Sequence, residues 1–199
     1  MAGISQRGIG IVGARALPDS FREQVSAVVR YLVERGYHIH SGGALGADLF
    51  ALRSVLEQTA CSQSVIFSPW VSVSGFPRAV QPFIEQFIFH SGRVDWGTVR
   101  PHSSRAIVTT GLLLRNQRLV SASSGIVAFL YGESRGTTQT ILQAIARGLR
   151  VVVFLCGGDA ILPRLGCGPS AGGFRAGRWV QLRCSGTCWA GAYLFKPQS

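Results

Sequence analysis

Residues 37–56, YHIHSGGALGADLFALRSVL, place a glycine-rich turn between a short strand pattern and a helix pattern. Tyr37 to His40 is expected to form the strand, and apolar residues recur at helical spacing after Ala47. The turn from Ser41 to Asp48 contains three glycines. Each glycine loses backbone conformational entropy on folding, a cost that an ordinary connection would not require. Glycine lets backbone N–H groups approach an anion, and the start of the following helix points its dipole at the same place. This turn therefore predicts a phosphate-binding site.

Two further turns repeat this arrangement along the chain. Gly13-Ala14-Arg15 follows the apolar run Ile9 to Val12, and Ser134-Arg135-Gly136-Thr137-Thr138 follows the apolar run Gly125 to Leu130. Both turns lie where an expected strand ends and an expected helix begins. Three such turns at one edge of a sheet predict a surface that binds phosphates, either of nucleotides or of a nucleic-acid backbone.

The remaining pattern alternates strands with helices, which predicts an α/β fold. We expect a Rossmann-like, doubly wound, mostly parallel sheet with helices on both faces and right-handed crossovers. The further expected strands are 64–67 and 150–155, and the further expected helices are 19–35, 79–89, 104–121 and 137–147.

The expected domain organisation is one Rossmann-like domain over residues 1–156 and an extension over residues 157–199. Prolines interrupt the periodic pattern between residues 68 and 103, which predicts an insertion or lid over the carboxyl edge of the sheet. The extension is rich in Gly, Arg and Cys, and its residues 178–183 and 189–195 predict a β hairpin.

Composition favours a polyanionic partner. The chain has 199 residues and a formal net charge of +11, and Lys196 is the single lysine among its 20 basic residues. Arginine suits bidentate contact with phosphate, so the charge fits nucleic acid. A GC-rich genome would also produce this preference for arginine, but it would not explain why the chain has only nine acidic residues.

We expect a cytoplasmic protein. Uninterrupted apolar runs are shorter than 18 residues, which disfavours a membrane span. Residues Met1 to Arg7 lead directly into the first expected strand and leave no room for an export signal.

No catalytic constellation, metal site or cofactor motif is evident. The five cysteines are Cys61, Cys156, Cys167, Cys184 and Cys188, an odd number without a nearby histidine to complete a zinc site. We interpret them as buried or free thiols. The four histidines lack a partner nucleophile at recognisable spacing and are interpreted as structural or surface residues. A non-enzymatic protein is favoured, and the question of enzymatic activity stays open.

The chain resembles the DprA/Smf DNA-processing proteins, within the SMF/DprA and LOG group of Rossmann-like domains. The resemblance covers residues 8–155 and rests on motifs that occur in the order of the family. These motifs are Ile11-Val12-Gly13-Ala14-Arg15, the turn from Ser41 to Asp48, Arg115-Asn116-Gln117-Arg118 and Gly136-Thr137.

The resemblance implies a surface for single-stranded DNA, action as a homodimer and transfer of the strand to a RecA-type recombinase. It implies that Arg15 and Arg115 neutralise the phosphates and that Thr137 supplies backbone and hydroxyl donors. Our leading hypothesis adds Arg118 as a third source of positive charge. The candidate site residues are Gly13, Arg15, Ser41, Gly42, Gly43, Gly46, Asp48, Arg115, Asn116, Arg118, Gly136, Thr137 and Thr138.

A second branch keeps another function open. The turn from Gly42 to Asp48 and Phe67-Ser68-Pro69-Trp70 are similar to the small YspA-like domains, for which nucleotide-derived ligands are implied. The alternative function is therefore a sensor or hydrolase for such a ligand. Against a LOG-type hydrolase, Thr140 stands where that group carries a glutamate.

Structural interpretations of the same residues also stay open. Gly13 with Arg15 fits an ordinary tight turn that carries a surface arginine, and Asp48 fits a first helical turn that complements the helix dipole. Arg115 and Arg118 fit a solvated basic stripe on one helix face. Thr137 fits a plain helix cap.

Overall fold

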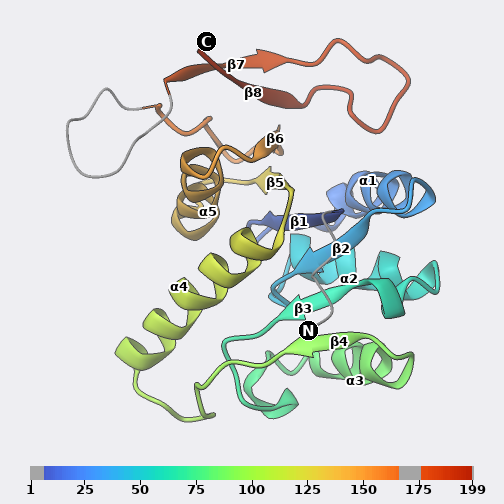
Figure 1. The fold of residues 1–199 in the computed structure, drawn as a ribbon, viewed down its shortest axis with the longest axis vertical. Coiled ribbons are helices and arrows are strands. Elements are labelled where there is room, and N and C mark those ends of the chain that lie inside the picture. Colours follow the sequence, from blue (N-terminus) through green and yellow to red (C-terminus); the bar gives the residue numbers. More distant parts are fainter. Residues whose placement is uncertain (1–6, 166–175, 199) are drawn as a thin grey trace.

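The computed structural model describes residues 7–165 and 176–198, which form one eight-stranded sheet in the order β4-β3-β2-β1-β5-β6-β8-β7 (Figure 1). Cys167 lies outside the described residues. The first six strands run parallel to one another: β1 (Gly8–Gly13), β2 (His38–Ser41), β3 (Val65–Phe67), β4 (Arg93–Asp95), β5 (Gly125–Leu130) and β6 (Arg150–Leu155). The last two are antiparallel: β7 (Gly177–Gln181) and β8 (Tyr193–Pro197).

In the part of the chain that the structure describes, five α-helices connect these strands. They are α1 (Arg22–Glu34), α2 (Ala47–Glu57), α3 (Gln81–Phe89), α4 (Arg105–Ala122) and α5 (Arg135–Ala146). Three short 3-10 helices are η1 (Asp19–Phe21), η2 (Cys61–Gln63) and η3 (Val73–Gly75). Within the described residues, no helix combines the length and the apolar character that a bilayer crossing requires.

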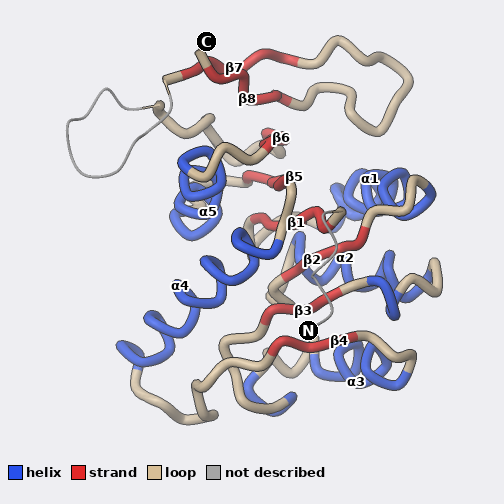
Figure 2. Tube along the Cα trace, in the orientation of Figure 1, coloured by secondary structure: helices blue, strands red, loops and turns tan. Residues whose placement is uncertain are grey.

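The helices cover both faces of the sheet, as Figure 2 shows. Successive strand residues point to opposite faces, so Ile11 belongs to the core cluster that includes residues of α1, α2 and α3, whereas Val12 belongs to the cluster that includes residues of α4 and α5. Every residue of β5 is buried, because this central strand is covered on both sides. The prediction of a doubly wound, mostly parallel α/β fold is confirmed.

The chain order places a switch point between β1 and β5. The chain moves outward from β1 to β4 and returns through α4 to β5, which pairs with the other side of β1. The loops after β1 and β5 therefore leave their strands toward opposite faces. In open α/β sheets, ligands bind outside the carboxyl ends of the strands at such a point.

Residues 68–103 contain a unit that the sequence pattern did not reveal. Helix α3 lies close to its expected position, but β4 was not predicted, and it extends the sheet by pairing with β3. This strand has three residues, and two of them, Arg93 and Asp95, are charged, so it lacks the apolar run typical of a buried strand.

The two C-terminal strands continue the same sheet. Strand β8 pairs with β6, and Phe195 is buried among residues packed against α5. Trp189, in the connection between the two strands, packs edge-on against Tyr31 of α1. The division of the chain at residue 157 into a domain and an extension stays a prediction.

Candidate nucleic-acid interface

A pocket of about 430 Å³ lies at the carboxyl edge of the sheet, where the loops after β1, β2 and β5 come together with α4. We call it the carboxyl-edge pocket. Its lining includes seven of the predicted site residues: Gly13, Arg15, Asp48, Arg115, Asn116, Gly136 and Thr137.

The loop after β1 is fixed by packing. A Cβ atom at Gly13 would lie 2.5 Å from Cβ of Ala47 and 2.7 Å from the Phe129 carbonyl oxygen, so a side chain does not fit there. The backbone N–H of Ala14 donates to the same carbonyl at 2.9 Å. This anchoring turns the chain outward and leaves Arg15 exposed at the pocket.

The three glycines of the loop after β2 are required by internal packing. A Cβ atom at Gly42 would overlap the Arg115 guanidinium, and one at Gly46 would lie 2.2 Å from the Ala14 carbonyl oxygen. Gly43 has a φ of +64° and faces the ring of Phe76. These contacts account for the glycines without a ligand.

Asp48 and Arg115 form a buried ion pair behind this loop. Nη1 of Arg115 lies 3.6 Å from Oδ2 of Asp48. The Arg115 side chain is 7% exposed and the Asp48 side chain is 4% exposed. Oδ2 also accepts a hydrogen bond from the Ala44 backbone N–H at 3.3 Å. Burial raises the pKa of the Asp48 carboxyl, and the positive charge of Arg115 opposes that shift. The interpretation of Arg115 as a solvated side chain is therefore wrong.

Two buried polar atoms beside this pair lack a hydrogen-bond partner among the described residues. They are Nε of Arg115 and Oγ of Ser41. Because a buried polar group without a partner is costly, both atoms are available to a water molecule or a ligand group that reaches the loop.

Arg118 does not reach the carboxyl-edge pocket. Its guanidinium donates to the backbone carbonyls of Ser68 and Trp96 and lies 3.0 Å from the Asp95 carboxylate. It lines a separate cavity of about 650 Å³ between α4 and the ends of β3 and β4. Arg118 therefore ties α4 to the loops that follow β3 and β4.

The start of α5 forms the open wall of the carboxyl-edge pocket. A Cβ atom at Gly136 would meet no atom within 4 Å, so the backbone is accessible at this point. Ser134 holds the N-cap position in a non-helical conformation, and its hydroxyl donates to Oγ1 of Thr137 at 2.7 Å instead of accepting from a backbone N–H of the helix. The first N–H groups of a helix have no intrahelical acceptor, and they carry the positive end of the helix dipole. Thr138, which was also predicted, lies outside the lining.

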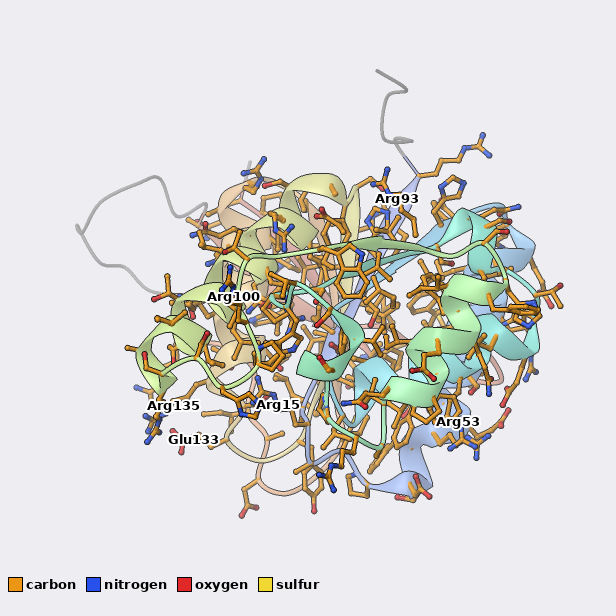
Figure 3. The ribbon with its side chains drawn as sticks, turned by 90° about the horizontal axis from the view of Figure 1, so that it is seen from below. Arg15, Arg53, Arg93, Arg100, Glu133 and Arg135 are labelled. Atoms are coloured by element: carbon orange, nitrogen blue, oxygen red, sulfur yellow. The ribbon has the colours of Figure 1, made fainter. Side chains whose placement is uncertain are left out.

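The charges around the pocket leave one arginine unpaired. Asp48 is paired with Arg115, and Glu133 is paired with Arg135 at 3.0 Å. Within residues 7–165 and 176–198, no carboxylate lies within ion-pair distance of Arg15. Figure 3 shows Arg15, Glu133 and Arg135 at the same end of the molecule, away from Arg93.

Sequence reasoning missed several lining residues. Tyr131 and Glu133 line the pocket from the loop after β5, Thr140 lines it from α5, and Thr109 lines it from α4. Ser134, which belongs to the predicted turn, lines it as well. Their signal was position: Tyr131 to Ser134 directly follow a strand whose residues are all apolar or glycine. Thr140, interpreted as the replacement for a LOG-type glutamate, does face this pocket.

Comparison with known proteins identifies relatives of this fold. The family model for DNA recombination-mediator protein A matches residues 1–159. DNA processing protein A from Helicobacter pylori, solved to explain its single-stranded DNA binding mode, is 18% identical with a TM-score of 0.59. DNA processing protein A from Streptococcus pneumoniae is 19% identical with a TM-score of 0.61. The structural-genomics target TM1055 is 21% identical with a TM-score of 0.51.

The matched regions are partial. They cover 76% of this chain for each DNA processing protein and 73% for TM1055. They span 66% of the Helicobacter protein, 51% of the Streptococcus protein and 72% of TM1055. At these identities the likeness shows a shared fold. A comparison with curated proteins gave no match.

Proposed function

The chain belongs to the DNA recombination-mediator protein A family, and from this premise we propose that it binds single-stranded DNA by its phosphates and acts as a DNA-processing recombination mediator. The carboxyl-edge pocket is the proposed site. The Helicobacter pylori relative, whose fold this chain shares, is a single-stranded DNA-binding protein.

One observation carries the proposal: the unpaired guanidinium of Arg15 lines the same pocket as the open N-terminus of α5. A phosphate between them would receive charge-assisted hydrogen bonds from the arginine and from the backbone amides near Gly136. These groups contact the sugar-phosphate backbone rather than a base edge, so binding should depend little on sequence.

We assign the predicted residues to two roles. Arg15, Asn116, Gly136 and Thr137 line the pocket and contact the strand, with Gly13 shaping the turn that presents Arg15. The remaining predicted residues act on the fold. Asp48 and Arg115 support the loop after β2, which also includes Ser41, Gly42, Gly43 and Gly46, whereas Thr138 and Arg118 make no direct contact with the strand.

We further propose that the protein works in the cytoplasm as a homodimer that hands the strand to a RecA-type recombinase. The basic surface supports the strand-binding part of this proposal, because the net charge of +11 attracts a polyanion. Sedimentation analysis would test the dimer, and a peak at the monomer mass of 21.3 kDa at micromolar concentration would contradict it.

The function is tested by measuring binding of labelled single-stranded oligonucleotides at rising salt concentration. We expect clear binding at about 50 mM salt and a steep loss of affinity as salt rises, because neutralised phosphates release counterions. Oligonucleotides of different sequence should bind alike. Failure to bind any single-stranded oligonucleotide at that salt concentration would refute the proposal.

The size of the pocket favours one alternative function, a sensor or hydrolase for a nucleotide-derived ligand. A volume of about 430 Å³ lies in the range of small-molecule sites, and Tyr131 and Glu133 contribute an aromatic ring and a carboxylate to its wall. A thermal-shift panel separates the two functions. Stabilisation by a mononucleotide without any effect of oligonucleotide would favour the alternative.

A further inference from the structure

A second pocket, of about 580 Å³, lies at the opposite edge of the sheet from the carboxyl-edge pocket. It is lined at the amino ends of β1, β5 and β6, by the end of α1 and by the connection between β7 and β8. We call it the amino-edge pocket. Figure 1 shows the β7–β8 connection on the α1 side of the sheet. The family match ends at residue 159, so the part of the lining from Leu182 to Leu194 lies outside the matched region.

Three aromatic side chains line this pocket. Tyr31 and Trp189 meet edge to face, with ring centroids 5.4 Å apart and planes at 89°, and Tyr37 lies in the same lining. The Trp189 ring also stacks on Phe154 of the sheet at 6.2 Å, which holds it in place. Fixed aromatic rings of this kind contact a flat ring at low cost in conformational entropy, through edge-to-face as well as stacked arrangements.

The charge of the pocket is positive. Arg35 and Arg150 belong to the lining, which contains neither aspartate nor glutamate. Within residues 7–165 and 176–198, neither arginine lies within ion-pair distance of a carboxylate. The Arg35 guanidinium lies over the Tyr31 ring, 3.5 Å from its centroid, which orients it beside the aromatic wall.

We propose that the amino-edge pocket binds a flat aromatic ring that carries an anionic group, with a nucleoside monophosphate as its chemical type. The ring would pack against the wall that Tyr31, Tyr37 and Trp189 form, and the phosphate would pair with Arg150 and Arg35. The volume fits one such molecule, and a few charged groups in a largely apolar wall are typical of ligand sites. This inference is independent of the proposed function, because the two pockets share no lining residue.

The proposal is tested with adenosine monophosphate as the probe, and with adenosine and inorganic phosphate as its separate halves. Binding is followed by calorimetry and by quenching of tryptophan fluorescence. Adenosine monophosphate should bind more tightly than either half, and Arg150→Gln should weaken it about tenfold. Because this arginine is exposed, the variant should keep the melting temperature of the parent protein.

Two controls locate the binding. Trp189→Phe keeps an aromatic ring and should remove most of the fluorescence change, whereas Arg15→Ala changes the carboxyl-edge pocket and should leave the affinity for adenosine monophosphate unchanged. Affinity lost in Arg15→Ala but kept in Arg150→Gln would place the nucleotide at the other pocket and overturn the proposal. Absence of binding at about 1 mM probe would also overturn it.

Binding of a short oligonucleotide shows whether the pocket takes a free nucleotide or a nucleotide of a DNA strand. If a short oligodeoxyadenylate binds the wild-type protein and loses affinity in Arg150→Gln, the pocket takes a nucleotide of a strand. If Arg150→Gln affects only the free nucleotide, the pocket takes a small molecule. Either result supports an aromatic anion site, and equal affinity of both probes for both proteins contradicts it.

Discussion

The guanidinium of Arg115 lies against the backbone of Gly42, where a Cβ atom would overlap Nη1. The arginine comes from α4 and the glycine from the loop after β2, so this contact joins two elements that lie far apart in the sequence. The Asp48 carboxylate, 3.6 Å from the same guanidinium nitrogen, completes the arrangement. The shape of one wall of the carboxyl-edge pocket therefore depends on a buried ion pair.

Arg115→Ala should destabilise the protein by about 3–5 kcal/mol, because it leaves the buried Asp48 carboxylate without its partner. Urea unfolding followed by circular dichroism measures the loss. The double variant Asp48→Asn with Arg115→Gln should cost less than the sum of its single variants, since the two residues are coupled. A loss below about 1 kcal/mol for Arg115→Ala would show that the pair is not an important support of the fold.

Gly42→Ala and Gly136→Ala should have opposite effects on stability. The Cβ atom at Gly42 would lie 1.5 Å from Nη1 of Arg115, and overpacking of this kind costs about 1–3 kcal/mol. Gly136 is helical and has open space, so alanine there should be neutral or stabilising. Thermal unfolding compares the two variants. Equal destabilisation by both would contradict the packing described for Gly42.

Gly136→Val should weaken binding of single-stranded DNA, because its side chain would occupy the space where the phosphate meets the helix N-terminus. The loss should be about tenfold, the equivalent of one hydrogen bond to a charged group. Fluorescence anisotropy with a labelled oligonucleotide measures the loss, and Ala146→Val, at the exposed far end of the same helix, serves as a substitution control. Unchanged affinity of Gly136→Val would place the strand elsewhere.

Arg118→Ala should destabilise the fold without a large effect on DNA affinity. The side chain donates to the carbonyls of Ser68 and Trp96 and pairs with Asp95, so its loss should cost about 1–3 kcal/mol. Urea unfolding and the anisotropy assay separate the two effects. If Arg118→Ala is folded and lowers DNA affinity as much as Arg15→Ala does, Arg118 contacts the strand after all.

His40 should make stability depend on pH. Burial, together with the positive charges of His38 and Arg93, lowers its pKa from 6.5 to about 4. The folded protein therefore resists protonation that the unfolded chain accepts. The full contribution of the neutral His40 ring to the free energy of unfolding is present above pH 6.5. This free energy should fall by about 3 kcal/mol as the pH drops from 6.5 toward 4.

The variant His40→Asn isolates this effect, because asparagine retains a polar group near Ser123, whose hydroxyl lies 3.0 Å from Nδ1 of the histidine. The difference in unfolding free energy between parent and variant should change between pH 6.5 and 4. His90→Gln, at an exposed position, serves as the control. A difference that stays constant over this range would refute the assignment.

The sequence predicted the fold well because the central strands are apolar and their turns contain glycine. The bounds of β5 and β6 are those expected, since β5 is a run of apolar residues after Gly125 and β6 is a run of apolar residues after Arg150. Strand β4 could not be predicted, because it has three residues and its main support is pairing with β3.

The meeting of the three turns could be predicted from the sequence, whereas the packing of individual residues around them could not. Three turns were expected to meet, and residues from all three do line one pocket. The burial of Arg115 was missed, because it depends on a carboxylate that the distant α2 presents. One signal was available: Gly111, Arg115 and Leu119 are spaced four residues apart, and all three lie on the buried face of α4.

Contact of a DNA phosphate with Arg15 and the N-terminus of α5 is tested most directly by comparing Arg15→Ala with Arg93→Ala. Both remove one exposed arginine, but Arg93 lies far from the pocket (Figure 3). Affinity for a single-stranded oligonucleotide is measured over a range of salt concentrations. We predict that Arg15→Ala lowers affinity about tenfold and flattens the logarithmic salt dependence by about 0.7, whereas Arg93→Ala changes both much less. Equal effects of the two substitutions would show that Arg15 does not hold the strand.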